Sequence, residues 1–225
     1  DYRGVRSMSL AMFDLDNTLI GGDSDYLWGE FLCEKGIIED TASFQKMNEY
    51  FYQQYEVGKL DIYAWAEFSF KVLTEYSIDE LNDLRQNFIH QKIEPIFLDK
   101  AQSCINQHKE NGDTVLVITA SNTFITAPIA EMYGINHLLA TEPEFKDGRF
   151  TGKVSGVPCF QSGKIDNLMP WIEKHNKNLK GSYFYSDSHN DLPLLELVDN
   201  PVAINGDPRL TSTANKNGWP NLDWR

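Results

Sequence analysis

The stretch "LAMFDLDNTLI" (Leu10–Ile20) decides the fold class of this chain. Its first residues are continuously apolar, as in a strand of a parallel sheet that is covered on both faces. Two carboxylates, Asp14 and Asp16, follow where the strand should end, although an unpaired buried carboxylate is energetically costly. The stretch therefore predicts a buried strand whose carboxyl end carries a functional site.

Further apolar runs along the chain resemble buried strands, and segments with helical spacing lie between most of them. Strands alternating with helices indicate an α/β fold with a parallel, Rossmann-like sheet. Residues 144–154 predict a hairpin, in which Asp147-Gly148 suits a tight two-residue turn. The expected strands are 10–14, 114–120, 137–141, 182–187 and 201–205, and the expected helices are 99–112, 123–134, 162–175 and 190–198.

Residues 22–95 break this alternation, because they contain almost no strand-like run. Many aromatic residues recur there at helical spacing, which favours a helical bundle with a core of its own. We therefore predict an α/β core domain at residues 8–21 and 96–225, with a helical cap domain at 22–95 inserted after the first strand. The expected cap helices are 24–36, 42–58, 61–76 and 78–93.

The composition and the net charge of the chain exclude some classes of binding partner. The chain has 33 acidic and 20 basic residues, a net charge of −13, and no block of Lys or Arg. We therefore expect neither a nucleic acid nor an anionic membrane as partner. No apolar run reaches the roughly 18 residues of a membrane span, and the first residues lack a secretory pattern. The three cysteines, Cys33, Cys104 and Cys159, form no disulfide framework. A cytoplasmic protein is therefore expected. The oligomeric state, and whether residues 1–7 are native, stay open.

Polar side chains gather at the predicted strand ends, where open α/β sheets bind their ligands. Four of them are acidic and one is a lysine, so the group carries −4 and +1 if all are ionised. Two carboxylates about 4 Å apart repel by about 4 kcal/mol at an effective dielectric near 20, so the group needs a cation. A hard ion such as Mg²⁺ suits oxygen ligands. The residues are Asp14, Asp16, Thr119, Lys164, Asp187 and Asp191.

The same residues resemble the four motifs of the haloacid dehalogenase-like phosphatases. "DLDNT" (14–18), a threonine after the next strand, a lone lysine and "DSHND" (187–191) occur in the family's order. A helical insertion after the first motif, with "VGKL" (57–60) and "FKDGRFTGKV" (145–154), is similar to subfamily IB, the branch of the phosphoserine phosphatases. The resemblance covers about residues 10–203 and implies a Mg²⁺-dependent phosphatase acting on a small phosphorylated metabolite.

The resemblance also implies roles for the acidic residues. Asp14 would be the nucleophile, which forms an aspartyl-phosphate intermediate. Asp16 would be the general acid and base, with its backbone carbonyl on the metal so that its side chain stays free. Asp14 and Asp187 would supply the carboxylate ligands of Mg²⁺.

Further roles fall on residues around the phosphate. Thr119 would hydrogen-bond a phosphoryl oxygen, and Lys164 would offset the charge of the nucleophile. Asp191 would orient Lys164 or a metal-bound water, while Asn190 and Ser121 would lie around the phosphate site. Each residue alone has a structural alternative, because Asp, Asn, Ser and Thr favour turns and helix caps. His189, within the last motif, is interpreted as a loop histidine.

Substrate specificity is expected from the cap domain, which would close over the site and exclude water. The phosphoserine enzymes carry an acidic residue nine positions after the nucleophile, where Asp23 lies here. They also bind the substrate carboxylate with an arginine in the helical module. Aligned by "GKL", that position is Glu67 in this chain, which would repel a carboxylate, and Arg85 lies well downstream.

The hypothesis is therefore a substrate that carries a cation. Asp23, Asp25 and Glu67 would bind an amine, unless they are merely solvated acids of helix surfaces. Histidinol phosphate fits this description, as would phosphocholine or phosphoethanolamine. A phosphoserine phosphatase, and a phosphotransferase or mutase on the same scaffold, remain alternatives. The aromatic residues considered for stacking on a ring or cation are Trp28, Tyr63 and Trp65.

Overall fold

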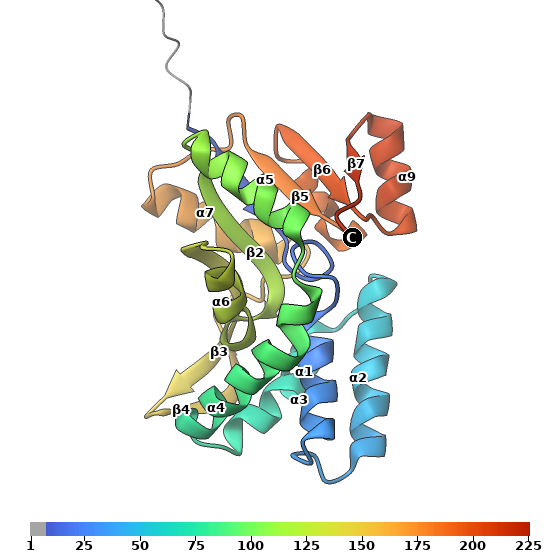
Figure 1. Cartoon of the computed structure of the whole chain (residues 1–225), viewed down its shortest axis with the longest axis vertical. Coiled ribbons are helices and arrows are strands. Elements are labelled where there is room, and N and C mark those ends of the chain that lie inside the picture. The colour runs from blue at the N-terminus through green and yellow to red at the C-terminus, as the bar shows by residue number, and fades with distance from the viewer. Residues whose placement is uncertain (1–7) are drawn as a thin grey trace, which may run out of the picture.

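The structure, a computed structural model, describes residues 8–225, so the question about residues 1–7 lies outside the described part (Figure 1). A seven-stranded sheet with the order β4-β3-β2-β1-β5-β6-β7 forms its centre. β1 (Leu10–Phe13) lies in the middle and pairs in parallel with β2 (Thr114–Asn122) and β5 (Tyr183–Ser186). The predicted α/β fold with a Rossmann-like sheet is confirmed.

Alternate residues of β1 enter two different hydrophobic clusters, one on each face of the sheet. Ala11 and Phe13 belong to one cluster, and Leu10 and Met12 to the other. This is the strand periodicity of two, with both faces buried. The first cluster includes residues of α5 (Asp99–Glu110) and α6 (Thr123–Met132), and the second those of α7 (Gly163–Lys174), α8 (Leu192–Leu195) and α9 (Pro208–Asn217).

The four predicted helices between β1 and β2 form, and we call them the cap helices. Each begins after an Asp or Ser whose side chain accepts a backbone N–H of the first turn, as N-caps do. The expectation of a separate bundle core is wrong, because Phe31 and Phe88 belong to the same cluster as Phe13. The division into two domains stays a prediction. The helices are α1 (Ser24–Glu34), α2 (Thr41–Glu56), α3 (Ile62–Thr74) and α4 (Ile78–Phe88).

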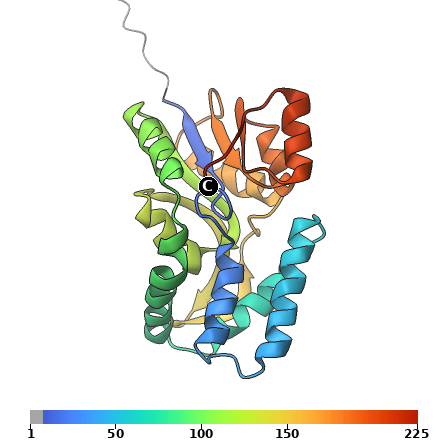
Figure 2. The same cartoon turned by 45° about the vertical axis from the view of Figure 1, so that its right-hand side comes forward.

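The predicted hairpin forms with the expected turn. β3 (His137–Lys146) and β4 (Arg149–Ser155) are antiparallel, and Asp147 and Gly148 have φ values of 51° and 80°. β3 is longer than predicted, because its first half pairs with β2 and its second half continues into the pairing with β4. Figure 2 shows the hairpin reaching the cap helices, and β4 contacts α3.

The C-terminal part adds elements that the sequence did not predict. After β6 (Asn200–Ile204) come α9 and the short β7 (Asn221–Leu222), and the predicted helix at 190–198 is only a 3₁₀ turn followed by α8. Trp224 is buried against Tyr185 and Phe13, so the tail packs on the sheet. Among residues 8–225, no helix is both long and apolar enough to cross a bilayer.

Candidate active site

Three of the predicted site residues lie at one edge of the sheet. Asp14 follows β1 directly, Thr119 lies in the second half of β2, and Asp187 follows β5. β1 is hydrogen-bonded to both other strands in parallel, so their carboxyl ends meet at this edge. Strand direction therefore brings together residues that are far apart in the sequence.

Lys164 is the fixed positive charge of this edge. It is the second residue of α7, and it is only 2% exposed. Its Nζ lies 3.1 Å from Asp14 Oδ1 and 2.8 Å from Asp191 Oδ1, and it donates to the carbonyl oxygen of Ile118 at 3.2 Å. Burial opposes the charge of Lys164, but the attraction of Asp14 and Asp191 outweighs burial, so its pKa is raised.

Asp14 and Asp187 form a pair with the chemistry of a cation site. Asp14 Oδ2 is buried and has no hydrogen-bond partner. Burial and then the charge of Asp14 raise the pKa of Asp187 well above its usual value, and Thr18 Oγ1 donates to Asp187 Oδ1 at 3.1 Å. Across residues 8–225, no group of three or more His, Cys, Asp or Glu side chains is arranged to hold a metal. The unpartnered oxygen of Asp14 beside Asp187 fits a hard divalent ion whose remaining ligands would be backbone or water oxygens.

Asp16 is anchored between a cap helix and the sheet. Its Oδ1 accepts the backbone N–H of Ser24, the first residue of α1, at 2.6 Å, and its Oδ2 accepts the hydroxyl of Ser121. Ser121 in turn donates its backbone N–H to Thr119 Oγ1 at 3.2 Å. Burial raises the pKa of Asp16, and the two serines partly lower it. The carboxyl group is thus shifted toward its protonated form and held at the pocket.

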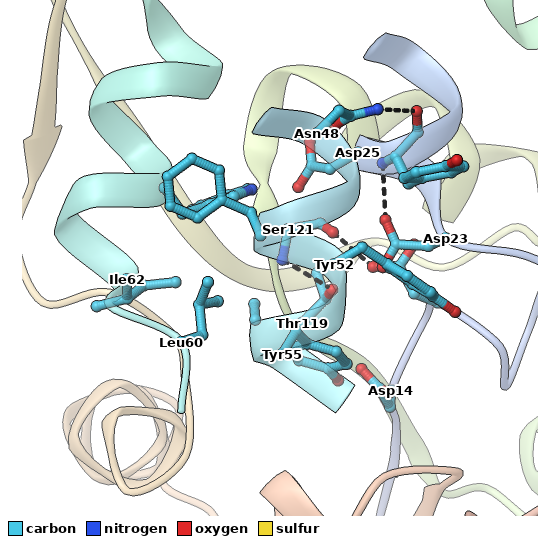
Figure 3. A pocket seen from close by; sticks show the side chains of 15 residues that line it. Asp14, Asp23, Asp25, Asn48, Tyr52, Tyr55, Leu60, Ile62, Thr119 and Ser121 are labelled. Carbon is cyan, nitrogen blue, oxygen red and sulfur yellow. Dashed lines mark hydrogen bonds between the residues drawn. The ribbon is translucent and has the colours of Figure 1, made fainter. Parts of the chain in front are cut away.

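These residues line a pocket between the sheet edge and the cap helices (Figure 3). Asp14, Asp16, Thr119 and Ser121 line it from the sheet side. Figure 3 shows Tyr55 beside Asp14, and burial followed by the charge of Asp14 raises the pKa of Tyr55 well above its usual value. The cap side includes Asn48, Phe51, Tyr52 and Tyr55 of α2 and Ile62 and Trp65 of α3.

Within the described residues, every charged side chain that lines the pocket is an aspartate. Asp23 caps α1 by accepting the backbone N–H of Tyr26 at 2.8 Å. Asp25 Oδ1 accepts the side-chain amide of Asn122 at 2.8 Å, while its Oδ2 is buried without a partner. Burial and then the charge of Asp16 raise the pKa of Asp25 to about 7, and the same two causes raise that of Asp23 well above its usual value. This wall of the pocket is therefore suited to a cation.

We expect Asp25→Asn to stabilise the folded protein at neutral and alkaline pH. The pKa of Asp25 is 3.8 in the unfolded chain and about 7 in the folded one. Below pH 3.8 both states are protonated, so ionisation of Asp25 costs no folding free energy. Between pH 3.8 and about 7 the unfolded state is ionised while the folded state stays protonated, so the stability falls over this range and levels off above it. The asparagine removes this penalty in folding free energy. A pKa difference of about 3 units between the two states corresponds to a penalty of at most about 4 kcal/mol.

The measurement is the melting temperature of both proteins between pH 5 and pH 8. The gain of Asp25→Asn should be largest at pH 8 and should shrink as the pH falls. Glu67→Gln, which removes an exposed carboxylate of α3, is the control and should change little at either pH. A gain that is independent of pH would contradict the buried charge at Asp25.

Three residues that the sequence predicts as substrate contacts do not line the pocket in this structure. Glu67 is exposed and does not line the pocket, and neither does Tyr63, which is 63% exposed. Successive helix residues are about 100° apart, so the face of α3 that presents Trp65 to the pocket turns Glu67 away. Trp28 is buried against Phe88 in the hydrophobic core.

Two residues of the last motif lie outside the pocket lining. The side chain of Asn190, which is predicted to lie around the phosphate, binds Tyr55 and Gln161 in this structure. His189 is held by Asp207, whose Oδ2 lies 2.7 Å from its Nδ1. Both residues face the end of α2 rather than the pocket.

The side chains of α2 that close the pocket are not distinguishable in the sequence from those of a helical core. Tyr52, Tyr55 and Phe51 were interpreted as part of a bundle core, although they line the pocket. The only sequence signal was their helical spacing, which is the same for a core and for a pocket wall. Arg85, by contrast, donates to the carbonyl oxygen of Phe124 at 2.8 Å and is not part of the pocket.

Comparison with known proteins defines the class. Residues 11–196 match the family model of the haloacid dehalogenase-like hydrolases. The chain therefore belongs to this family, and it is an enzyme of the phosphatase type. The prediction made from the four motifs is confirmed at this level.

Individual relatives are similar over nearly the whole chain. A histidinol-phosphatase of Neisseria meningitidis is 41% identical over 96% of this chain and 99% of its own length. The phosphoserine phosphatase SerB1 of Mycobacterium tuberculosis is 32% identical over 96% of this chain and 70% of its own length. A crystal structure of a Bordetella pertussis protein of unknown function superposes with a TM-score of 0.91, at 39% identity over 97% of this chain and 99% of that one. A substrate-bound phosphoserine phosphatase, at 18% identity and a TM-score of 0.71 over 97% and 94% of the chains, shows the shared fold.

Proposed function

We propose that this phosphatase is a Mg²⁺-dependent phosphomonoesterase that acts through an aspartyl-phosphate on a small phosphorylated amino alcohol. The observation that carries the proposal is the contact of Lys164 with Asp14 at the floor of a pocket whose charged lining is entirely acidic. The lysine–carboxylate contact supports phosphoryl transfer to Asp14. The acidic lining supports a leaving group with a positive charge.

In the proposed first step, a carboxylate oxygen of Asp14 attacks phosphorus. A bond from Asp14 to phosphorus forms, the bond to the leaving alcohol oxygen breaks, and Asp16 gives its proton to that oxygen. In the second step Asp16 takes a proton from the water that attacks phosphorus. Inorganic phosphate leaves, and Asp14 is restored. The raised pKa of Asp16 supports its role as the acid of the first step.

Other side chains are proposed to stabilise the phosphoryl group. Thr119 Oγ1 accepts a backbone N–H from Ser121, so its own hydroxyl hydrogen can point to a phosphoryl oxygen. Lys164, oriented by Asp191, offsets the negative charge at Asp14. A Mg²⁺ ion held by Asp14, Asp187 and the backbone carbonyl of Asp16 would neutralise charge and polarise the phosphoryl group.

An amine on the leaving group would find a partner in the acidic wall. Asp25 Oδ2 is buried without a hydrogen bond, which is unfavourable unless a donor such as an ammonium group binds there. Tyr52 and Trp65 provide aromatic surface in the same pocket for a ring or a cation. Histidinol phosphate carries both an ammonium and an imidazole and has no carboxylate, and the relative from Neisseria meningitidis bears the name of this activity.

Phosphoserine is the second candidate substrate, because the relative from Mycobacterium tuberculosis is named a phosphoserine phosphatase. Its carboxylate would enter a pocket in which, among the described residues, no Lys or Arg is part of the lining. Transfer of the phosphoryl group to an acceptor other than water, as in a phosphotransferase or mutase, has no specific observation in its favour.

The test is phosphate release from a panel of phosphomonoesters, measured with Mg²⁺ and after treatment with EDTA. We expect kcat/KM for histidinol phosphate to exceed that for phosphoserine by at least about 100-fold, as differences of about 3 kcal/mol in transition-state binding produce. Activity should vanish in EDTA and return with Mg²⁺. Faster hydrolysis of phosphoserine would overturn the cationic substrate, and full activity in EDTA would overturn the metal.

A further inference from the structure

The C-terminal end of α2 is bound by side chains of the α/β part. Asn190 Nδ2 donates to the carbonyl oxygen of Tyr55 at 2.8 Å. Gln161 Nε2 donates to Asn190 Oδ1 at 3.0 Å and to the carbonyl oxygen of Gly58 at 3.5 Å. Two core side chains thus bind two backbone carbonyls of the segment that ends α2 and turns toward α3.

Gly58 is the residue at which the backbone after α2 comes closest to His189. Its φ of +73° lies in the left-handed region, and a Cβ built there would be 2.9 Å from His189 Nε2 and 3.7 Å from Asn190 Oδ1. His189 is fixed from the other side, because Asp207 Oδ2 accepts its backbone N–H at 2.7 Å and lies 2.7 Å from its Nδ1. His189 Nε2 is itself buried without a hydrogen-bond partner. The ring therefore forms a firm wall against which only a glycine fits.

This contact lies between the pocket and the catalytic segments. Gln161 precedes Lys164 by three residues, and Asn190 directly precedes Asp191, whose carboxylate binds Lys164. On the other side, Tyr55 belongs to the pocket wall that α2 contributes (Figure 3). The two segments that bind α2 are thus the same two segments that carry Lys164 and Asp191.

We propose that Gln161, His189 and Asn190 form a socket for the Tyr55–Gly58 segment and act as positioning residues for the reaction. The socket holds α2 in the position in which Tyr52 and Tyr55 close the pocket around the leaving group. A substrate that depends on this wall then binds only when the segment is seated. The inference depends on the phosphatase activity of the family and on no particular substrate.

The chain offers a matched pair of glycines for the test. Gly36 follows α1 with a φ of +72°, and a Cβ there would meet nothing within 4 Å, whereas Gly58 follows α2 with nearly the same φ. Gly36→Ala and Gly58→Ala therefore introduce the same backbone strain. Only Gly58→Ala also displaces the segment from His189.

The experiment compares kcat and KM of wild type and both variants, with Mg²⁺, on the fastest phosphomonoester of the panel and on p-nitrophenyl phosphate. The latter has a good leaving group that needs little help from the pocket wall. We expect Gly58→Ala to raise KM for the fastest substrate at least 10-fold while kcat for p-nitrophenyl phosphate stays within 2-fold of wild type. Gly36→Ala should lower the melting temperature only through the shared backbone strain, and it should leave both KM values unchanged.

Two further variants separate the socket from general destabilisation. Gln161 also has a positive φ, of 51°, which asparagine tolerates, so Gln161→Asn keeps the backbone but shortens the side chain that reaches Gly58. It should reproduce the KM effect. Gly58→Ala combined with His189→Ala removes the wall and should recover most of the lost affinity. Equal KM values for Gly36→Ala and Gly58→Ala, or parallel losses on both substrates, would overturn the proposal.

Discussion

Asp14→Asn is expected to abolish turnover while the protein stays folded. The amide cannot form the acyl phosphate, and removal of a covalent nucleophile lowers kcat by roughly 10⁴-fold or more. The fold should survive because asparagine has the same shape and Lys164 keeps its contact with Asp191. The melting temperature should not fall, since burial raises the pKa of Asp14 to about 7 and its charge is therefore a burden to the folded state.

The measurement is phosphate release with Mg²⁺ together with thermal unfolding. Asp166→Asn is a suitable control, because it removes an exposed carboxylate from the first turn of α7, two residues after Lys164. It should leave kcat unchanged. A residual rate of more than about one hundredth in Asp14→Asn would exclude Asp14 as the nucleophile, since a lost nucleophile removes far more.

Lys164→Ala is expected to cause the second-largest loss, in both activity and stability. The substitution leaves Asp14 and Asp191 buried beside each other without their shared cation. Breaking a buried ion pair by removing one partner costs about 3–5 kcal/mol of unfolding free energy. The loss should grow as the pH rises, because without Lys164 the buried carboxyl group of Asp14 is protonated at low pH and becomes charged at high pH. We expect kcat to fall by about 10²–10⁴-fold as well, because the positive charge at the nucleophile is gone.

A double variant distinguishes the two losses. Lys164→Ala with Asp191→Asn removes one of the two unpaired charges, so it should regain much of the melting temperature without regaining kcat. Lys174→Ala, which truncates an exposed lysine at the end of the same helix, serves as the control for α7. If the stabilised double variant recovers activity, Lys164 has only a structural role.

The sequence predicted that the cap helices form but not which of their side chains line the pocket. The spacing of apolar residues predicted the four helices and their order, because a helix is a local structure with a local period. It could not tell which stripe of α2 faces a core and which faces a pocket. Tyr55 and Glu67 illustrate this, since the rotation of α2 depends on its contact with α1 and the rotation of α3 on its contact with β4, which is remote in the sequence.

The motif at residues 187–191 was also only partly predictable. The sequence indicated that Asp187 and Asp191 belong to the strand-end group, and the structure places Asp191 on Lys164 and Asp187 beside Asp14. Asn190 lies between them, yet its side chain points to Tyr55, because the 3₁₀ turn at His189–Asp191 sends successive side chains in different directions. A residue's place in a motif therefore did not determine its partner.

The sequence by itself determined the fold class and the charged strand ends, because a buried parallel strand must be continuously apolar and the ends of parallel strands meet at one edge. Only the tertiary structure decided the wall of the pocket, the hydrophobic cluster that one face of the sheet shares with the cap helices, and the contact of Gly58 with His189. The physical reason is range. The periods of strands and helices depend on residues that are neighbours in the sequence. The rotation of a helix and the closest approach of two backbones depend instead on side chains that only folding brings together.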